Sequence, residues 1–296
     1  MDEYKYYRAS STADAVKALS EAGEKALVLA GGTDLMVAVN HGRMDRGHTF
    51  VYIGDVPGLS GIAESKGALS IGSLVTAAQI LESGLVREKA SALWMAAKEL
   101  AAPQVRNRAT IGGNIGTASP SGDFIAALVA LGAEAAIESG GKHVKVEDIP
   151  IGVKKTSLAS NEIITGITIP LSDTKQGSAF VKVGKRKAMT ISIANAAVWL
   201  ALEADGKTVK DIRIAVGACA PTVVRAKSVE EALKGADISS LSGRPSPIAE
   251  GEIKPITDQR ATAWYRREVV PVLIRRAVLK AAAIANGADP GEEAAE

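Results

Sequence analysis

The sequence predicts an α+β protein built from two domains. Its 296 residues are about twice the length of a common domain of roughly 150 residues. Short apolar runs alternate with capped helical segments up to residue 170, and a polar, turn-rich stretch at 170–177 separates them from three further strand-like runs. We therefore expect domains at 1–173 and 176–285, followed by a mobile tail at 286–296 without large apolar side chains.

In the first domain, a helix is expected at 11–22, because Ser11 and Asp14 stand at capping-box spacing before apolar residues with a helical period. The strand expected at 25–30 is short and apolar, which favours burial on both faces. A second capping box, Thr76 with Gln79, starts another helix. The remaining expectations are strands at 50–53, 68–71, 134–137, 144–146 and 161–169, helices at 86–100 and 124–131, and an irregular stretch at 101–123.

The second domain is expected to contain a three-stranded antiparallel sheet, with strands at 179–183, 192–202 and 209–218. Asp205 and Gly206 form a hairpin signal between the last two strands. Two helices should follow, at 228–234 and 261–284, and Pro271 should kink the second.

Composition excludes several classes of protein. Lys and Arg number 35 against 33 Asp and Glu, a balance that argues against binding to duplex nucleic acid. The single cysteine, Cys219, excludes an intrachain disulfide and a cysteine-ligated iron–sulfur cluster on this chain. The longest apolar run, 124–133, is much shorter than the roughly 20 residues of a membrane-spanning helix, and the first residues lack the pattern of a secretion signal. We expect a cytoplasmic protein without a membrane span.

Two glycine pairs are the candidate binding motifs. Gly31 and Gly32 directly follow the apolar strand, where glycine permits positive φ, exposes successive main-chain N–H groups and lets a phosphate approach without meeting a Cβ. Thr33 adds a hydroxyl group. The alternative is an ordinary strand-to-helix turn capped by Thr33 or Asp34.

Gly112 and Gly113 repeat this arrangement within the irregular stretch, and Thr117, Ser119 and Asp123 follow them. A dinucleotide needs N–H donors for its pyrophosphate and polar partners for its sugar hydroxyls, and this set supplies both. The alternative is an Ω-loop that is satisfied by its own side chains.

Other signatures are missing from the sequence. It has no Gly-x-Gly-x-x-Gly, and the segment 205–208 imitates the end of a phosphate-binding loop without the leading glycine. The three histidines are scattered without ligand spacing, so we assign no metal-binding residue and no catalytic residue. The densest basic cluster, 182–187, is either a solvated face or a site for an anion or a partner.

The segments 30–35, 104–114 and 118–123 together resemble the FAD-binding subunit of the xanthine dehydrogenase, or molybdenum hydroxylase, family. Within that family the chain looks most like the medium flavoprotein subunit of carbon monoxide dehydrogenases. The resemblance continues through 161–163, 217–225 and 264–277, so it covers nearly the whole chain.

The resemblance implies a two-part FAD-binding domain of the vanillyl-alcohol oxidase and p-cresol methylhydroxylase type, with subdomains of about 1–55 and 56–173, and a small C-terminal α+β domain. Both glycine motifs and Thr117 would hold the FAD phosphates, Asp123 would bind ribityl or ribose hydroxyls, and Ile164 would lie near the FAD rings. The implied FAD-binding residues are Ala30, Gly31, Gly32, Thr33, Asp34, Leu35, Thr110, Ile111, Gly112, Gly113, Asn114, Thr117, Ser119, Asp123, Ile164 and Lys182.

The function implied by the resemblance is electron transfer in a heterotrimeric molybdenum hydroxylase. Electrons would pass from the [2Fe-2S] clusters of a small iron–sulfur subunit through FAD to an external acceptor, and a large subunit would hold the molybdopterin cofactor. Two heterotrimers would form a dimer. The alternatives are a self-sufficient flavoenzyme resembling UDP-N-acetylmuramate dehydrogenase and a binding protein that has lost its flavin. The final helix offers four docking charges, Arg266, Arg267, Arg275 and Arg276.

Overall fold

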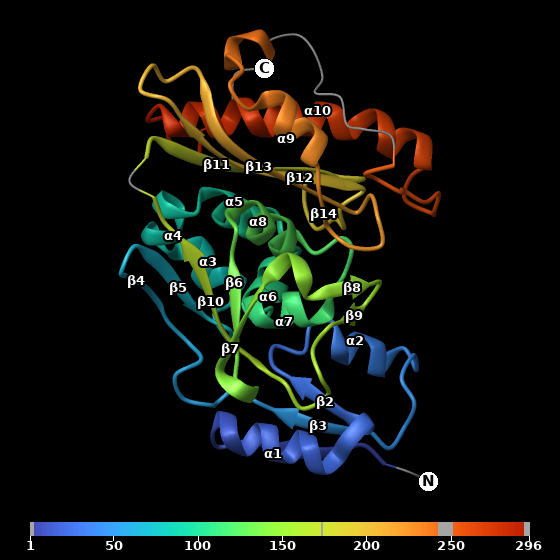
Figure 1. The fold of residues 1–296 in the computed structure, drawn as a ribbon. Coiled ribbons are helices and arrows are strands. Elements are labelled where there is room, and N and C mark those ends of the chain that lie inside the picture. The colour runs from blue at the N-terminus through green and yellow to red at the C-terminus, as the bar shows by residue number, and fades with distance from the viewer. Residues whose placement is uncertain (1–2, 173, 242–250, 293–296) are drawn as a thin grey trace.

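The computed structural model describes residues 3–172, 174–241 and 251–292, which form three stacked units (Figure 1). A small parallel sheet lies at the N-terminal end, a five-stranded sheet with its helices lies in the middle, and a four-stranded sheet lies under a long helix at the opposite end. This mixture of helices and sheets confirms the predicted α+β class. Within these described ranges, no helix is long and apolar enough to cross a membrane.

The N-terminal unit is a parallel sheet in the order β1-β3-β2 that packs against one helix. As predicted, the Ser11 side chain caps this helix by accepting a hydrogen bond from the main-chain N–H of Asp14. Ala15 and Leu19 of the helix are buried together with Val51 of the central strand. The elements are β1 (Lys5–Arg8), α1 (Thr12–Ala22), η1 (Gly23–Lys25), β2 (Ala26–Leu29), α2 (Leu35–Asn40) and β3 (Thr49–Tyr52).

The prediction that the strand before the first glycine pair is buried on both faces is wrong. Ala26 is buried, but Val28 is 38% exposed and its neighbours Leu27 and Leu29 are only partly buried. These three residues line a large cleft, so the apolar run faces a cavity instead of a second layer of protein. An apolar run by itself does not distinguish the two surroundings.

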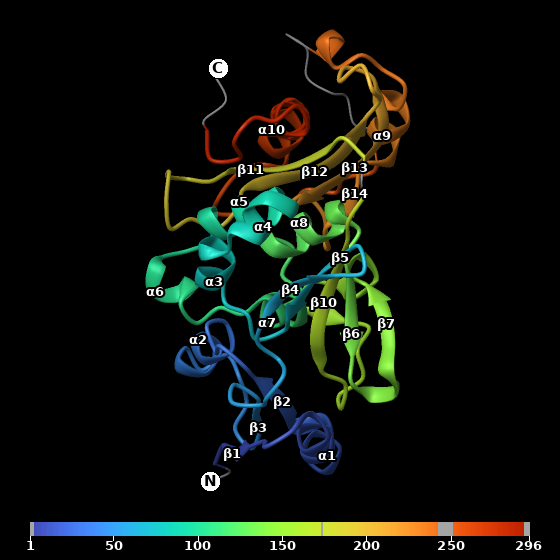
Figure 2. The ribbon, with the colours of Figure 1, turned by 90° about the vertical axis from the view of Figure 1, so that its left-hand side faces the viewer.

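The middle unit is an antiparallel sheet in the order β4-β5-β10-β6-β7, with helices against one of its faces (Figure 2). Every residue of α8 is buried, because this helix packs between other helices of the middle unit and the C-terminal sheet. The elements are β4 (Ile62–Ser65), β5 (Ala68–Gly72), α3 (Ala77–Glu82), α4 (Gly84–Lys89), α5 (Ser91–Glu99), α6 (Pro103–Arg106), α7 (Ile111–Thr117), α8 (Asp123–Leu131), β6 (Glu134–Ile137), η2 (Ser139–Gly141), β7 (Lys142–Lys145), η3 (Val146–Asp148), β8 (Pro150–Gly152), β9 (Lys155–Thr156) and β10 (Ile164–Pro170).

Two predictions for this unit are wrong in detail. The helix expected at 86–100 is two helices, α4 and α5, because the chain leaves helical geometry at Ala90, with φ −138°. The stretch 101–123, expected to be irregular, contains α6 and α7. Its proline and glycine residues conceal these short helices, since both residue types are poor helix formers.

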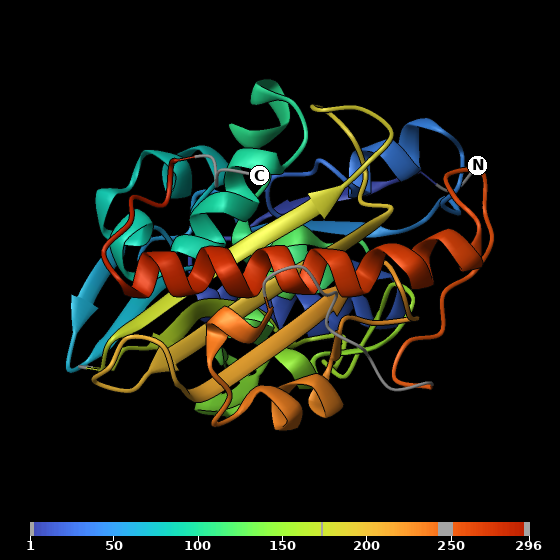
Figure 3. The same cartoon turned by 90° about the horizontal axis from the view of Figure 1, so that it is seen from above.

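The C-terminal sheet has four antiparallel strands in the order β11-β12-β13-β14, so the predicted three-stranded sheet is corrected. The added strand is only two residues long and pairs with Ala215 and Val216, which leaves no alternation to detect in the sequence. The long helix α10 covers one face of this sheet (Figure 3), and α5 and α8 lie on the other. The elements are β11 (Gln176–Val183), β12 (Ala194–Leu202), β13 (Val209–Gly217), β14 (Val224–Arg225), α9 (Lys227–Leu233), η4 (Ile238–Leu241) and α10 (Ala263–Ala285).

The final helix continues through Pro271 as one element. Of the four arginines expected to offer docking charges, Arg266 is only 3% exposed and forms an ion pair with Asp258, so it has an internal role. Beyond the helix, the Asp289 carboxylate pairs with the Arg87 guanidinium of the middle unit at 2.6 Å. Mobility of the tail stays a prediction, and residues 173 and 293–296 lie outside the described residues.

Candidate functional site

A cleft of about 1130 Å³ lies between the N-terminal and middle units. Its walls come from β2 and the loop that follows it, from the segment that contains α7, and from the segment 154–164. Thr190 and Ile191 of the C-terminal domain also line it. The cleft is larger than a common small-molecule pocket of about 300–1000 Å³, which suits an extended ligand such as a dinucleotide.

The first glycine motif forms one wall of this cleft. Gly32 has a φ of +72°, the positive value predicted for this position. Within the described chain, the main-chain N–H groups of Gly31, Gly32 and Thr33 donate to no protein acceptor. Asp34 stands at the N-cap position of α2, but its side chain makes no capping hydrogen bond and instead accepts one from Lys154 Nζ at 3.0 Å. The alternative of a turn capped by Asp34 therefore finds no support.

The second glycine motif differs from its prediction. Gly112 and Gly113 lie in the first turn of α7, where the Thr110 hydroxyl accepts a hydrogen bond from Gly113 N at 3.1 Å, and neither glycine has positive φ. Glycine at 112 instead allows close packing, because a Cβ there would stand 2.7 Å from Ser73 Cβ. A Cβ on Gly31 would collide with the carbonyl of Arg108, so glycine at this position lets the first motif pack against the segment that precedes α7. The Ω-loop alternative is also wrong, because the segment is helical.

Two buried polar atoms at the cleft lack a partner. Ser73 Oγ and Asn114 Oδ1 have no hydrogen bond among the described residues, although both residues line the cleft. A buried polar atom without a partner costs free energy, so these atoms fit a ligand that supplies hydrogen bonds. Of the two cations that line the cleft, Lys154 is paired with Asp34, and Arg43 suits an anionic ligand. The sequence had no local motif that pointed to Ser73, Arg43 or Lys154.

Most of the predicted cofactor-binding residues gather at this one cleft. Ile111 is instead fully buried in the core, and Lys182 lies behind Asp123 with 2% of its side chain exposed. Those that line the cleft are Ala30, Gly31, Gly32, Thr33, Asp34, Leu35, Thr110, Gly112, Gly113, Asn114, Thr117, Ser119, Asp123 and Ile164.

Asp123 and Lys182 form a buried ion pair, with 2.6 Å between Asp123 Oδ2 and Lys182 Nζ. Burial raises the pKa of the Asp123 carboxyl, whereas the charge of Lys182 acts to lower it. Lys182 Nζ also donates to the carbonyl of Glu99 at 3.0 Å. The pair therefore joins the start of α8 to strand β11.

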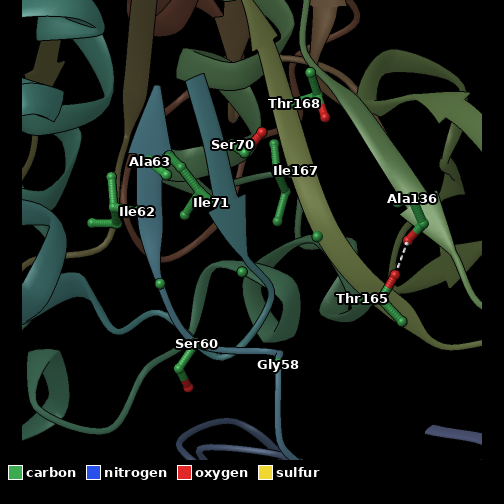
Figure 4. A pocket seen from close by; sticks show the side chains of 13 residues that line it. Gly58, Ser60, Ile62, Ala63, Ser70, Ile71, Ala136, Thr165, Ile167 and Thr168 are labelled. Atoms are coloured by element: carbon green, nitrogen blue, oxygen red, sulfur yellow. Dashed lines mark hydrogen bonds between the residues drawn. The ribbon is translucent and has the colours of Figure 1, made fainter. Parts of the chain in front are cut away.

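A second hollow, of about 420 Å³, lies on the open face of the five-stranded sheet (Figure 4). Gly72 and Gly166 pair across β5 and β10, so no side chain fills the sheet face there. The Thr165 hydroxyl donates to the carbonyl of Ala136 at 3.2 Å. The residues that line this hollow include no ionisable side chain, so it offers no charged group to a cofactor or a metal.

Comparisons with known proteins agree with this geometry. The family model described as the FAD binding domain in molybdopterin dehydrogenase matches residues 2–172, and the CO dehydrogenase flavoprotein C-terminal domain matches 179–281. The xanthine dehydrogenase FAD-binding subunit of Escherichia coli O157:H7 is 31% identical over 288 residues, which are 95% of this chain and 97% of that protein. The carbon monoxide dehydrogenase medium chain of Afipia carboxidovorans is 32% identical over 286 residues, 96% of this chain and 98% of that one. The solved Cu,Mo-CO dehydrogenase superposes with a TM-score of 0.87 at 29% identity, covering 96% of this chain and 99% of that chain.

Fold, cleft and relatives define a flavoprotein subunit of an oxidoreductase. The chain belongs to the family of FAD-binding subunits of xanthine dehydrogenases and carbon monoxide dehydrogenases. The resemblance inferred from the glycine motifs is thereby confirmed.

Proposed function

We propose that this chain is the FAD-binding electron-transfer subunit of a heterotrimeric molybdenum hydroxylase. It would pass electrons from the [2Fe-2S] clusters of a small partner subunit through FAD to an external acceptor. Bound FAD supplies the redox chemistry, and the protein binds and orients it. A large partner subunit with a molybdopterin cofactor would oxidise the substrate. A dimer of heterotrimers and a cytoplasmic location belong to the same proposal.

The observation that carries this proposal is the set of unpaired polar groups at the cleft. Free main-chain N–H groups at Gly31, Gly32 and Thr33 suit phosphate oxygens, and the orphaned atoms of Ser73 and Asn114 suit further polar groups of a dinucleotide. Thr110, Gly112, Gly113, Asn114, Thr117, Ser119 and Ile164 remain proposed FAD contacts because they line the same cleft.

The cysteine content supports a division of labour between subunits. Two [2Fe-2S] clusters require about eight cysteine thiolates, and this chain has one cysteine. Burial raises the pKa of the Cys219 thiol to about 12, which disfavours the thiolate that a metal needs. Among the described residues, no group of three or more His, Cys, Asp or Glu side chains is placed to hold a metal ion.

Titration of the purified chain with FAD tests the proposal. We expect stoichiometric binding with quenching of flavin fluorescence, and no turnover with a nicotinamide donor and an organic substrate. Steady turnover by the chain alone would favour the self-sufficient flavoenzyme, and failure to bind added FAD would favour a protein that has lost its flavin.

A further inference from the structure

Asp123 is held almost entirely by the C-terminal domain. Its Oδ1 atom accepts hydrogen bonds from Ser192 Oγ at 2.7 Å and from Asn195 Nδ2 at 3.2 Å, and its Oδ2 atom accepts one from Lys182 Nζ at 2.6 Å. Asp123 begins α8 of the FAD-binding domain, whereas the three donors lie on β11, on β12 and just before β12. One carboxylate therefore accepts hydrogen bonds from three donors across the domain junction.

These contacts are buried and mutually supported. Ser192 is 1% exposed and Asn195 is fully buried, and Asn195 Nδ2 also donates to Ser192 Oγ at 3.1 Å. Burial of a carboxylate is costly unless donors and an opposite charge surround it, which these residues provide. The orientation of the Asp123 carboxylate is thus fixed by the C-terminal domain.

Helix capping does not explain this arrangement. The N-cap residue of α8 is Gly122, and among the described residues no main-chain N–H donates to the Asp123 carboxylate. An ionised carboxylate offers about four acceptor positions, and the three donors use three of them. Asp123 lines the cleft and keeps 7% of its side chain exposed, so a hydroxyl group of a ligand there would take the remaining position.

We infer that Ser192, Asn195 and Lys182 are positioning residues, which hold the Asp123 carboxylate ready to accept a hydrogen bond from a sugar-alcohol hydroxyl of the bound dinucleotide. The inference rests on the proposed function, because it takes the ligand of the cleft to be FAD. It assigns the C-terminal domain a direct part in cofactor affinity, through Asp123, in addition to the wall that it adds to the cleft.

The same domain junction supplies a matched control. Ser178 on β11 accepts a hydrogen bond from Ala92 N at 3.0 Å, and its carbonyl accepts one from the Ser91 hydroxyl at 2.6 Å. Ser178 is 3% exposed and does not line the cleft. Ser178→Ala therefore removes a buried interdomain hydroxyl of the same kind as Ser192 without touching Asp123.

The test compares the Kd for FAD and the thermal midpoint of the full-length protein and its variants. Ser192→Ala should raise the Kd about tenfold, the effect of about 1.4 kcal/mol expected from a lost hydrogen bond to a charged group. Ser178→Ala should lower the thermal midpoint about as much as Ser192→Ala does, because each removes one buried interdomain hydroxyl. It should leave the Kd within about twofold of the wild-type value. Asn195→Ala removes the other hydrogen bond to Asp123 Oδ1, and it replaces Ser192→Ala in the test if that variant does not fold.

A double-substituted reference shows whether Ser192 acts through Asp123. Asp123→Ala with Lys182→Met removes both members of the ion pair, so that no uncompensated charge stays buried. Adding Ser192→Ala to this reference should not raise the Kd further. An unchanged Kd in Ser192→Ala and Asn195→Ala, an equal rise in Ser178→Ala, or a further tenfold rise in the reference would overturn the inference. Failure of the wild-type protein to bind FAD would instead refute the proposed function.

Discussion

At the scale of single residues, Gly32 combines a positive φ with a place in the wall of the cleft. Its φ of +72° is strained for a residue with a Cβ, which would also stand 3.2 Å from Met36 Cγ. Gly32→Ala should therefore move the loop and weaken FAD binding about tenfold or more, as fluorescence titration would measure.

Gly67 is the matched control for Gly32. It has the same φ of +72° in the turn between β4 and β5, with open space around it and no contact with the cleft. Gly67→Ala should cost about 1 kcal/mol of folding stability without changing the affinity for FAD. Equal affinities in both variants would contradict a role of the Gly31–Gly32 loop in binding.

The ion pair of Asp123 with Lys182 gives a second prediction for single residues. Lys182→Met leaves an uncompensated buried carboxylate and should lower the free energy of unfolding by about 3–5 kcal/mol in urea denaturation. Asp123→Ala combined with Lys182→Met removes both charges and should lose less. A Lys182→Met variant that is more stable than the double variant would show that the Asp123 carboxyl is not charged once Lys182 is removed.

At the scale of elements, the start of α10 depends on a carboxylate with a low pKa. Burial acts to raise the pKa of Asp258, but hydrogen bonds from Arg260, Arg266 and Ala261 outweigh burial and lower the pKa from 3.8 to about 2. Arg266 also donates to the carbonyl of Ile193, which ties the helix to the end of β12 nearest the cleft.

The low pKa of Asp258 predicts a dependence of stability on pH. A lowered pKa gives stability that is present above the unfolded pKa of 3.8 and is lost as the pH falls toward about 2. Asp258→Asn should therefore reduce the free energy of unfolding by up to about 2 kcal/mol at pH 6, and by much less near pH 2. Thermal unfolding at both pH values checks this, and a loss that is independent of pH would argue against the ionised pair.

The elements that could be predicted from the sequence are those with a local signal. Ser11 and Thr76 cap their helices as expected, and the Asp205–Gly206 hairpin is present with Gly206 at φ +69°. The two-residue strand β14 and the short helices in 101–123 could not be predicted, because their pairing and capping partners define them and periodicity does not. The burial of β2 was predicted wrongly, because apolar residues line a cleft as well as a protein core.

At the scale of the whole molecule, the site combines segments that lie far apart in the sequence. Both glycine motifs could be located from the sequence, because each has a local pattern, but the second is the start of a helix and has no positive φ. Ser192 and Asn195 could not be linked to Asp123, since 69 and 72 residues separate them and no motif joins them. Lys182 was expected beside the cofactor and instead lies behind a residue that lines the cleft.

The central claim is that this chain transfers electrons as one subunit of a larger enzyme. The most direct measurement mixes the FAD-loaded chain, under anaerobic conditions, with the reduced iron–sulfur partner subunit and follows the flavin absorbance. The account predicts that the absorbance bleaches with the partner present, and that neither an organic substrate nor the chain's own groups bleach it in the partner's absence. A flavin absorbance that does not change with the reduced partner, or that an organic substrate bleaches in the partner's absence, would contradict it.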